Sequence, residues 1–209
     1  MIKAILWDFD GVILDSMPIR GYGFEKCFAA YPKEQTDQLL AYHNANGGKS
    51  RFVKIRYFFE HIRNESITEE QILKYAELFS QVMLELLCDK KLLIDETVTF
   101  IEKNYHNTPM HIVSGSEQNE LRFLCHELGL TDYFISIHGS PIEKDILVKN
   151  DLDKYGYHAS EVILIGDSIN DFDAAEANRV PFYGYNNPSL SKLNSEYITN
   201  FESFSLDQT

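Results

Sequence analysis

The chain opens on a short apolar run that ends in two carboxylates. Residues 2–7 read Ile-Lys-Ala-Ile-Leu-Trp, and Asp8, Phe9, Asp10 and Gly11 follow at once. A continuous apolar run of this kind predicts a strand buried on both faces, and ligands of open α/β sheets bind beyond the carboxyl ends of such strands. Buried carboxylates that lie close together normally require a cation or a shared proton. The alternative for this segment alone is a strand that simply ends in an Asp-rich turn.

Size and charge restrict the class of protein. The chain has 209 residues, of which 44% are hydrophobic and 24% charged, and this is ordinary for a folded protein with one core and an accessory lobe. A net charge of -13 disfavours nucleic acid or an anionic membrane as the main partner, because both are bound through basic patches. A small anionic substrate stays compatible, because a bound metal can invert the local field.

The cysteines and the apolar segments predict a cytoplasmic location. Cys27, Cys88 and Cys125 lie far apart and show no paired spacing, which favours a reducing compartment over a disulfide framework. The first apolar run is too short for a signal peptide. Nothing in the sequence approaches the ~18 apolar residues of a membrane span.

The chain divides into a helical part and an alternating part. Residues 16–88 contain no convincing strand, and helices are expected over 19–31, 34–46, 51–63 and 69–88. The last of these begins with a capping box formed by Thr68 and Gln71.

From about residue 94 onward, helices alternate with short apolar strands. The strands are expected over 110–113, 133–138, 162–165 and 181–185, and helices over 117–128, 143–155 and 172–177 separate them. This alternation indicates right-handed crossovers and a mainly parallel sheet. We therefore predict an α/β fold, with a doubly wound, Rossmann-like core made of residues 1–15 and 90–209. A helical cap domain, residues 16–89, is inserted after the first strand.

Polar side chains follow four of the predicted strands. In chain order they are Asp8 with Asp10, Ser114 with Gly115 and Ser116, Lys144, and Asp167 with Asp171. A hydroxyl and free amides at a helix start bind phosphate well, and a lysine there opposes the helix dipole and suggests an anionic partner. Each feature alone has an ordinary explanation: an N-cap, a solvated lysine or a first-turn acid. Together they place a nucleophile, metal carboxylates, a hydroxyl and a lysine at one edge of one sheet.

These motifs resemble those of the haloacid dehalogenase superfamily. The resemblance is to its phosphatase branch with a small helical cap, which includes phosphoglycolate phosphatase and β-phosphoglucomutase-like proteins. Residues 8–12 match the first motif of the family, Ser114 the second, Lys144 the third and residues 166–171 the fourth. Lys149 lies near Lys144 and competes with it for the third position.

The resemblance implies a two-step reaction. Asp8 would attack a phosphoryl group and form an aspartyl-phosphate, and Asp10 would protonate the leaving alcohol and then deprotonate the attacking water. Ser114, Gly115 and Lys144 would bind the phosphoryl oxygens.

The resemblance also implies a magnesium site, because Mg²⁺ prefers oxygen ligands and keeps waters while bridging to phosphate. The Asp8 carboxylate, the Asp10 carbonyl and Asp167 would bind the ion, with Asp171 as a further ligand or just outside the ligand set.

The cap is expected to select the substrate. Arg20, Lys49 and Arg51 are the candidates for substrate contact in this segment. In the alternative explanation, Gly47 and Gly48 end one helix and the basic residues are solvated. The sequence leaves open whether the protein is a monomer or a dimer.

The predicted function is Mg²⁺-dependent hydrolysis of a phosphomonoester that is a small metabolite, such as a sugar phosphate or phosphoglycolate. A phosphosugar mutase of the β-phosphoglucomutase type is the enzymatic alternative. A receiver-like signalling domain would also phosphorylate an aspartate beside Mg²⁺, although Ser114, not an aspartate, follows Val113 here. A non-catalytic binding domain is the remaining alternative.

Overall fold

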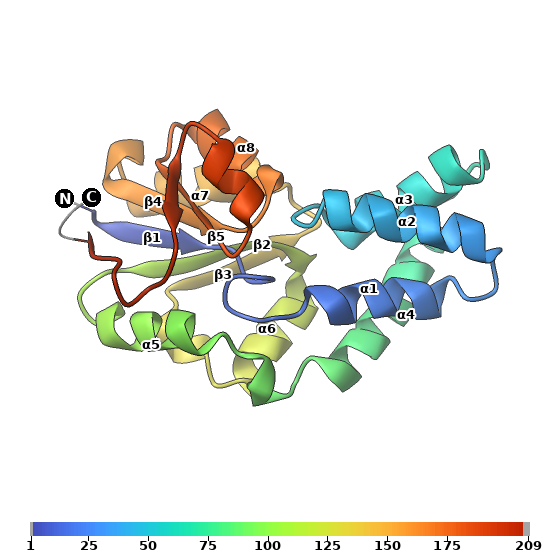
Figure 1. Cartoon of the computed structure of the whole chain (residues 1–209), viewed down its shortest axis with the longest axis horizontal. Coiled ribbons are helices and arrows are strands. Elements are labelled where there is room, and N and C mark those ends of the chain that lie inside the picture. The colour runs from blue at the N-terminus through green and yellow to red at the C-terminus, as the bar shows by residue number, and fades with distance from the viewer. Residues whose placement is uncertain (1, 207–209) are drawn as a thin grey trace.

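A computed structural model describes residues 2–206 and places six parallel strands in one sheet (Figure 1). The strand order is β3-β2-β1-β4-β5-β6. The strands are β1 (Ala4–Trp7), β2 (Met110–Glu117), β3 (Ser136–Ser140), β4 (Val162–Gly166), β5 (Phe182–Tyr185) and β6 (Glu196–Ile198). The predicted mainly parallel α/β sheet is confirmed.

The first strand lies at the centre of the sheet, which decides where the site forms. Trp7 at its end is level with Ile112 on β2 and Ile165 on β4. All four residues of β1 are buried. β2 lies on one side of β1 in the sheet and β4 on the other, so the strand order reverses at β1. Asp8, which follows β1, therefore lies at the usual ligand site of doubly wound sheets.

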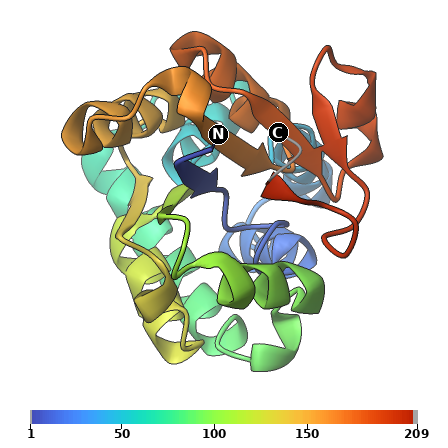
Figure 2. The ribbon, with the colours of Figure 1, turned by 90° about the vertical axis from the view of Figure 1, so that its left-hand side faces the viewer.

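Helices cover both faces of the sheet (Figure 2). α5 (Asp95–Asn104) and α6 (Gln118–Glu127) lie on one face, and α7 (Lys144–Tyr155) and α8 (Ile169–Asn178) on the other. Side chains of a strand alternate between faces. Ile5 and Trp7 accordingly belong to the larger apolar cluster, which includes α5 and α6, whereas Ala4 and Leu6 pack with the α7 and α8 side.

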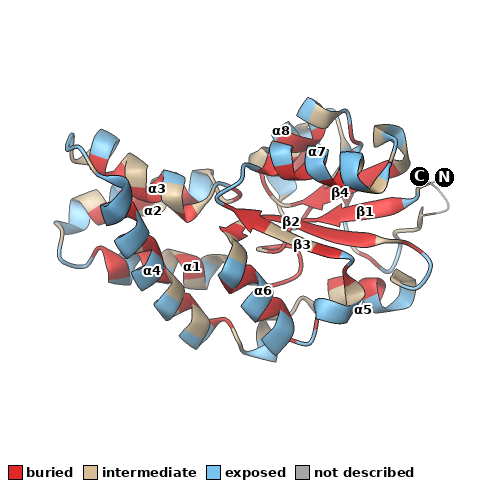
Figure 3. Cartoon of the chain, turned by 180° about the vertical axis from the view of Figure 1, so that it is seen from behind, coloured by how far each residue is buried: buried red, intermediate tan, exposed pale blue. Residues whose placement is uncertain are grey.

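Four helices form a second body beyond the carboxyl ends of the strands (Figures 1 and 3). They are α1 (Met17–Cys27), α2 (Lys33–Ala45), α3 (Arg51–Tyr57) and α4 (Glu69–Leu86). Aromatic side chains fill the space between them, with Phe24 against Phe79 and Phe28 against Phe58 at centroid distances of 4.5 and 4.4 Å. The predicted capping box at Thr68 is present. We call this body the cap; the exact division at residues 15/16 and 89/90 stays a prediction.

Several element boundaries differ from the predictions. The helix expected over 51–63 continues as a π-helical turn, Phe58–Ile62, and a 3₁₀ turn, Thr131–Tyr133, delays the start of β3 to Ser136. The polar tail adds β6 beside β5. Residues 1 and 207–209, which the predicted core includes, lie outside the described residues. Among residues 2–206, no helix is long and apolar enough to cross a membrane.

Ser114 and Ser116 belong to a strand, which corrects the prediction that they lie at a helix start as N-caps. β2 extends to Glu117, whose partner on β3 is Ser140. The side chain of Glu117 instead caps α6 and accepts hydrogen bonds from the amides of Asn119 and Glu120.

A buried polar cluster lies between β3 and α7, away from the strand ends. Ser136 Oγ lies 2.8 Å from His111 Nδ1 and donates to Asp151 Oδ1 at 3.3 Å. His138 Nε2 lies 3.3 Å from the same carboxylate oxygen. Burial raises the pKa of Asp151 to about 6, although the hydrogen bond from Ser136 opposes the change. Ionised Asp151 therefore destabilises the folded state at neutral pH.

Replacement Asp151→Asn is expected to stabilise the protein by about 1 kcal/mol at pH 8, because the carboxamide mimics the protonated acid and cannot ionise. In the native chain, the loss of stability caused by ionised Asp151 develops between pH 3.8, the ordinary pKa of this carboxyl group, and about pH 6. The gain should therefore vanish near pH 4. Urea unfolding at both pH values measures it, and Asp153→Asn, on the exposed side of α7, is the control. An equal gain at both pH values would contradict the explanation.

Candidate active site

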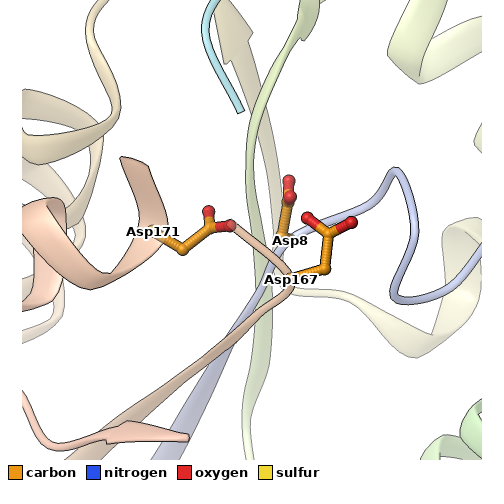
Figure 4. Close-up of side chains that lie close together, drawn as sticks. All are labelled: Asp8, Asp167 and Asp171. Atoms are coloured by element: carbon orange, nitrogen blue, oxygen red, sulfur yellow. The ribbon is translucent and has the colours of Figure 1, made fainter. Parts of the chain in front are cut away.

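Three carboxylates converge at the ends of β1 and β4. Asp8 follows β1, Asp167 follows β4 and Asp171 lies in the first turn of α8, and oxygens of all three lie within 4.8 Å of one another (Figure 4). Gly11 makes room for them: its φ is +76°, and a Cβ there would meet Asp167 Oδ2 at 2.1 Å. The neighbouring strands thus bring together residues that are more than 150 positions apart.

Lys144 lies inside this cluster. Its Nζ is 2.9 Å from Asp8 Oδ1 and also donates to Asp171 Oδ1. Lys149, the competing lysine, is exposed. The second oxygen of Asp171 accepts from Ser168, from the amide at 3.0 Å and the hydroxyl at 2.6 Å. Both oxygens of Asp171 therefore have partners, and this residue holds Lys144 beside Asp8.

The charges in the cluster do not balance. Burial raises the pKa of Asp8, and the charge of Asp171 adds to the effect, while Lys144 opposes it. Burial, followed by the charges of Asp8 and Asp171, also raises the pKa of Asp167. Burial disfavours the charged form of Lys144, but Asp171 and Asp8 outweigh it and hold its pKa above the usual range. One ammonium faces three acids, of which Asp8 and Asp171 are buried and Asp167 is half-buried, and this is an environment that attracts a further cation.

Asp10 faces away from the cluster and toward the cap. Its Oδ1 accepts from Arg20 Nε at 2.5 Å and from the hydroxyl of Ser16, and its Oδ2 accepts from Ser116 Oγ at 2.5 Å. Burial opposes ionisation, but Arg20 and the two hydroxyls outweigh it and keep the pKa of Asp10 below its usual value. In this arrangement Asp10 is an ionised acceptor.

Glu120 joins the cap to the core. It lies in α6, is buried, and accepts from Arg20 Nη1 at 3.0 Å and from both terminal nitrogens of Arg51 at 2.7 and 2.6 Å. Arg20 belongs to α1 and Arg51 to α3. Arg51 also donates to Ser80 of α4 at 2.6 Å. A single carboxylate of the core thus binds two guanidinium groups of the cap.

The loop after α2 closes the cap onto the strand ends. The Gly48 carbonyl accepts from Asn170 Nδ2 at 3.1 Å, and a Cβ on Gly115 would meet that carbonyl oxygen at 2.3 Å. A small inner pocket lies behind this contact, and Asp8 and Asp10 are among the residues that line it. A wider outer cavity reaches Lys144. Gly48, Lys49 and Gly115 line both and form the partition.

The remaining predicted residues lie around this pocket. Ser114 is buried at the end of β2, where its Oγ accepts from the amide of Ser116 at 3.1 Å. Arg20 and Arg51 line the inner pocket. Lys49 is exposed, with its ammonium 5.9 Å from the ring centre of Tyr42. The functional roles assigned to all of these residues stay predictions.

Sequence reasoning missed four residues of the pocket region: Ser116 as a partner of Asp10, Glu120, Lys54 and His43. For two of them, Glu120 and Lys54, the sequence contained a clue to their position on a helix. Glu120 is one helical turn before Leu124, on the apolar side of its helix, where a charge is unusual. Lys54 is three positions after Arg51, and side chains at that spacing share a helix face. Their partners lie far away in sequence, so their roles could not be inferred.

The family is decided by comparison with known proteins. A family model described as haloacid dehalogenase-like hydrolase matches residues 2–178. The chain belongs to the haloacid dehalogenase-like hydrolase family. This confirms the resemblance seen in the motifs, and the names of its relatives support the prediction of a haloacid dehalogenase-type phosphatase.

Relatives in sequence and solved structures match this chain over nearly its whole length. Phosphoglycolate phosphatase of Yersinia pestis is 24% identical over 88% of this chain and 83% of its own. That of Photorhabdus laumondii is 25% identical over 96% and 89%. The β-phosphoglucomutase of Clostridium difficile has a TM-score of 0.75 at 18% identity, over 100% of this chain and 95% of its own. CbbY of Rhodobacter sphaeroides in complex with phosphate has the same TM-score at 16% identity, over 97% and 96%.

Removing the charge of Glu120 tests its role as the tie between cap and core. Glu120→Gln is expected to lower the free energy of unfolding by about 3 kcal/mol, because it leaves the buried guanidinium of Arg51 without its counter-ion and removes one of the two carboxylates bound to Arg20. Urea denaturation measures the change. Glu60→Gln is the matched control, because its ion pair with Arg56 is exposed and should contribute less than about 0.5 kcal/mol. Similar losses in the two variants would contradict the role.

Proposed function

We propose that the protein is a magnesium-dependent phosphomonoester hydrolase that acts on a small phosphorylated metabolite through an aspartyl-phosphate. The observation that carries the proposal is Asp8, which lies in the inner pocket with Lys144 Nζ 2.9 Å from its Oδ1. The Phe9 amide also donates to Oδ1, at 2.8 Å. Oδ2 is then the oxygen available to attack phosphorus.

In the first step, Asp8 Oδ2 forms a bond to phosphorus and the bond from phosphorus to the alcohol oxygen breaks. The electron pair goes to the alcohol oxygen, which takes a proton from Asp10. In the second step, a water oxygen attacks the same phosphorus, Asp10 takes back a proton, and the bond to Asp8 breaks. Phosphate leaves, and both carboxyl groups return to their starting states.

The environment of Asp10 suits the second step directly. Arg20, Ser16 and Ser116 favour its ionised form, which is the form that accepts a proton from water. The first step needs the protonated form. A phosphoryl dianion beside Asp10 favours that form, because a like charge raises the pKa of a carboxyl group.

The acids at the strand ends fit a magnesium ion. They offer carboxylate oxygens only, which suits Mg²⁺. Burial, with the charges of neighbouring acids, raises the pKa values of Asp8 and Asp167 although Lys144 opposes the change. Asp8, Asp167 and the carbonyl of Asp10 would hold the ion. Asp171 already holds Lys144, so its place is beside the ligand set. When bound, the ion would neutralise charge on the phosphoryl group.

Phosphoglycolate is the substrate to test first, because relatives that cover 88–96% of the chain are named for it. Lys144 and the end of β2, with Ser114 and Gly115, would bind the phosphoryl oxygens. The mutase alternative rests on a likeness of fold alone, and isomerised sugar phosphate in the same assay would favour it. The cysteines, all three of which are free, agree with the proposed cytoplasmic location.

Two isosteric substitutions test the chemistry. Asp8→Asn removes the nucleophile and Asp10→Asn removes the proton donor and acceptor, so phosphate release should fall at least about 10²-fold in each. Release from phosphoglycolate and a panel of small phosphomonoesters is measured with Mg²⁺ and with EDTA. Asp173→Asn, on α8, is the control and should keep its activity. Release that survives in Asp8→Asn or in EDTA would contradict the proposal.

Metal binding has a readout that does not depend on activity. Mg²⁺ at 100 times its dissociation constant should stabilise the folded state by about 2.7 kcal/mol, which thermal unfolding detects. Without metal, Asp167→Asn should unfold no earlier than the native chain, because it relieves repulsion between buried acids, and Mg²⁺ should no longer shift its melting temperature. An unchanged shift in Asp167→Asn would show that the ion binds elsewhere.

A further inference from the structure

The cap brings three buried cations to the inner pocket, and two carboxylates of the core pair with them. Arg20, Arg51 and Lys54 all line the pocket and all are buried. The paired carboxylates are Asp10 and Glu120, and both bind guanidinium groups. One positive charge, that of Lys54, is left over.

The partners of Lys54 are neutral. Its Nζ donates to the Gly47 carbonyl at 2.9 Å and lies 3.0 Å from His43 Nδ1. Burial lowers the pKa of His43 to about 3, and the charges of Lys54 and Arg20 add to the effect, so the imidazole is neutral and accepts the hydrogen bond. A buried ammonium with only neutral acceptors is costly unless an anion joins it.

A second group in the same pocket also lacks a partner. Within residues 2–206, Nη2 of Arg20 is buried without a hydrogen-bond partner, although Nε and Nη1 of the same guanidinium are bound to Asp10 and Glu120. Arg51 differs, because both of its terminal nitrogens are occupied by Glu120 and its guanidinium lies 4.6 Å from the ring centre of Phe79. The unused charged donors of the pocket are therefore on Arg20 and Lys54, and Nε2 of neutral His43 is a further buried donor without a partner among the described residues.

We propose that Lys54, together with Nη2 of Arg20, binds a second anionic group of the substrate, a carboxylate or a further phosphate. This inference rests on the proposed phosphatase function and narrows its substrate class to small phosphomonoesters that are anionic at both ends. Phe24 and Phe79 also line the pocket, and their rings offer no hydrogen-bonding groups to a neutral, hydroxyl-rich substrate. Arg51 then has a positioning role, because it fixes Glu120 and through it Arg20.

The test compares three phosphomonoesters that share a two-carbon backbone, with the complete chain and Mg²⁺. Phosphoglycolate carries a carboxylate, 2-hydroxyethyl phosphate replaces it with a hydroxyl, and ethylene glycol bisphosphate carries a second phosphate. Lys54→Met should lower kcat/KM about 10- to 100-fold for the anionic compound that the subsite accepts, because a charged hydrogen bond is lost. The value for 2-hydroxyethyl phosphate should change less than about threefold. Which of the two anionic compounds loses rate identifies the group.

Two control variants separate the charge of Lys54 from its structural effects. Lys54→Arg keeps the charge and should keep the preference for the anionic substrate. Lys74→Met removes one exposed charge from α4 of the cap and should change nothing. Equal losses for charged and neutral substrates in Lys54→Met would overturn the proposal, because they would show a general structural role.

Binding separates this inference from the proposed chemistry. In the Asp8→Asn background, calorimetry with phosphoglycolate and with the bisphosphate should show about tenfold weaker binding of the recognised compound after Lys54→Met. If the native chain releases no phosphate but this difference persists, the phosphatase proposal fails and the subsite stands. If release is normal and the difference is absent, the subsite fails and the phosphatase stands.

The pH dependence gives a further signature. Burial lowers the pKa of Lys54 to about 7, and the charges of Arg20 and Arg51 add to the effect, while Asp10 and Asp167 oppose it; His43 of α2 is neutral. Free Lys54 therefore loses its charge above pH 7. The ratio of kcat/KM for the anionic over the neutral substrate should fall between pH 7 and 9 in the native chain and stay flat in Lys54→Arg. A ratio that falls equally in both would overturn the assignment.

Discussion

The repulsion among acids at the end of β1 is the constraint on which the rest of the structure depends. Asp8, Asp167 and Asp171 are brought within 4.8 Å of one another by parallel strands that are buried on both sides. Lys144 balances only part of this charge, and the pKa values of Asp8 and Asp167 stay raised. A fold that keeps such a cluster gives up stability for a site that is ready to bind a cation and an anionic group together.

The cap has the opposite imbalance, an excess of buried positive charge. Arg20, Arg51 and Lys54 crowd three cations over the pocket, and Asp10 and Glu120 of the core offset two of them. The same ion pairs join the cap to the core, so the contacts that hold the cap in place also offset part of its positive charge. We propose that the acidic cluster beneath the pocket binds a metal and that the cap above it binds an anion. A substrate that is anionic at both ends would complete both sets of charges.

The sequence was sufficient for the five strands β1 to β5 and for the acidic cluster, but not for β6 in the polar tail. The apolar run before Asp8 predicts a central strand, and the carboxyl ends of parallel strands share an edge, so Asp167 and Lys144 had to lie near Asp8. The secondary structure of the segment that contains Ser114 and Ser116 was predicted less well. Ser114 and Ser116 precede a helix-like pattern, but β2 continues through them because Glu117 pairs with Ser140 of β3, a contact that depends on register and not on local pattern.

The cap contacts were beyond sequence reasoning because they depend on how two bodies dock. Arg20 was a candidate for substrate contact, yet two of its nitrogens bind Asp10 and Glu120, 10 and 100 positions away. Spacing along a helix can show that Arg51 and Lys54 share a face, but not which of them meets a carboxylate. That difference decides their chemistry: the paired guanidinium holds the cap in place, and the unpaired ammonium is left to recognise what enters the pocket.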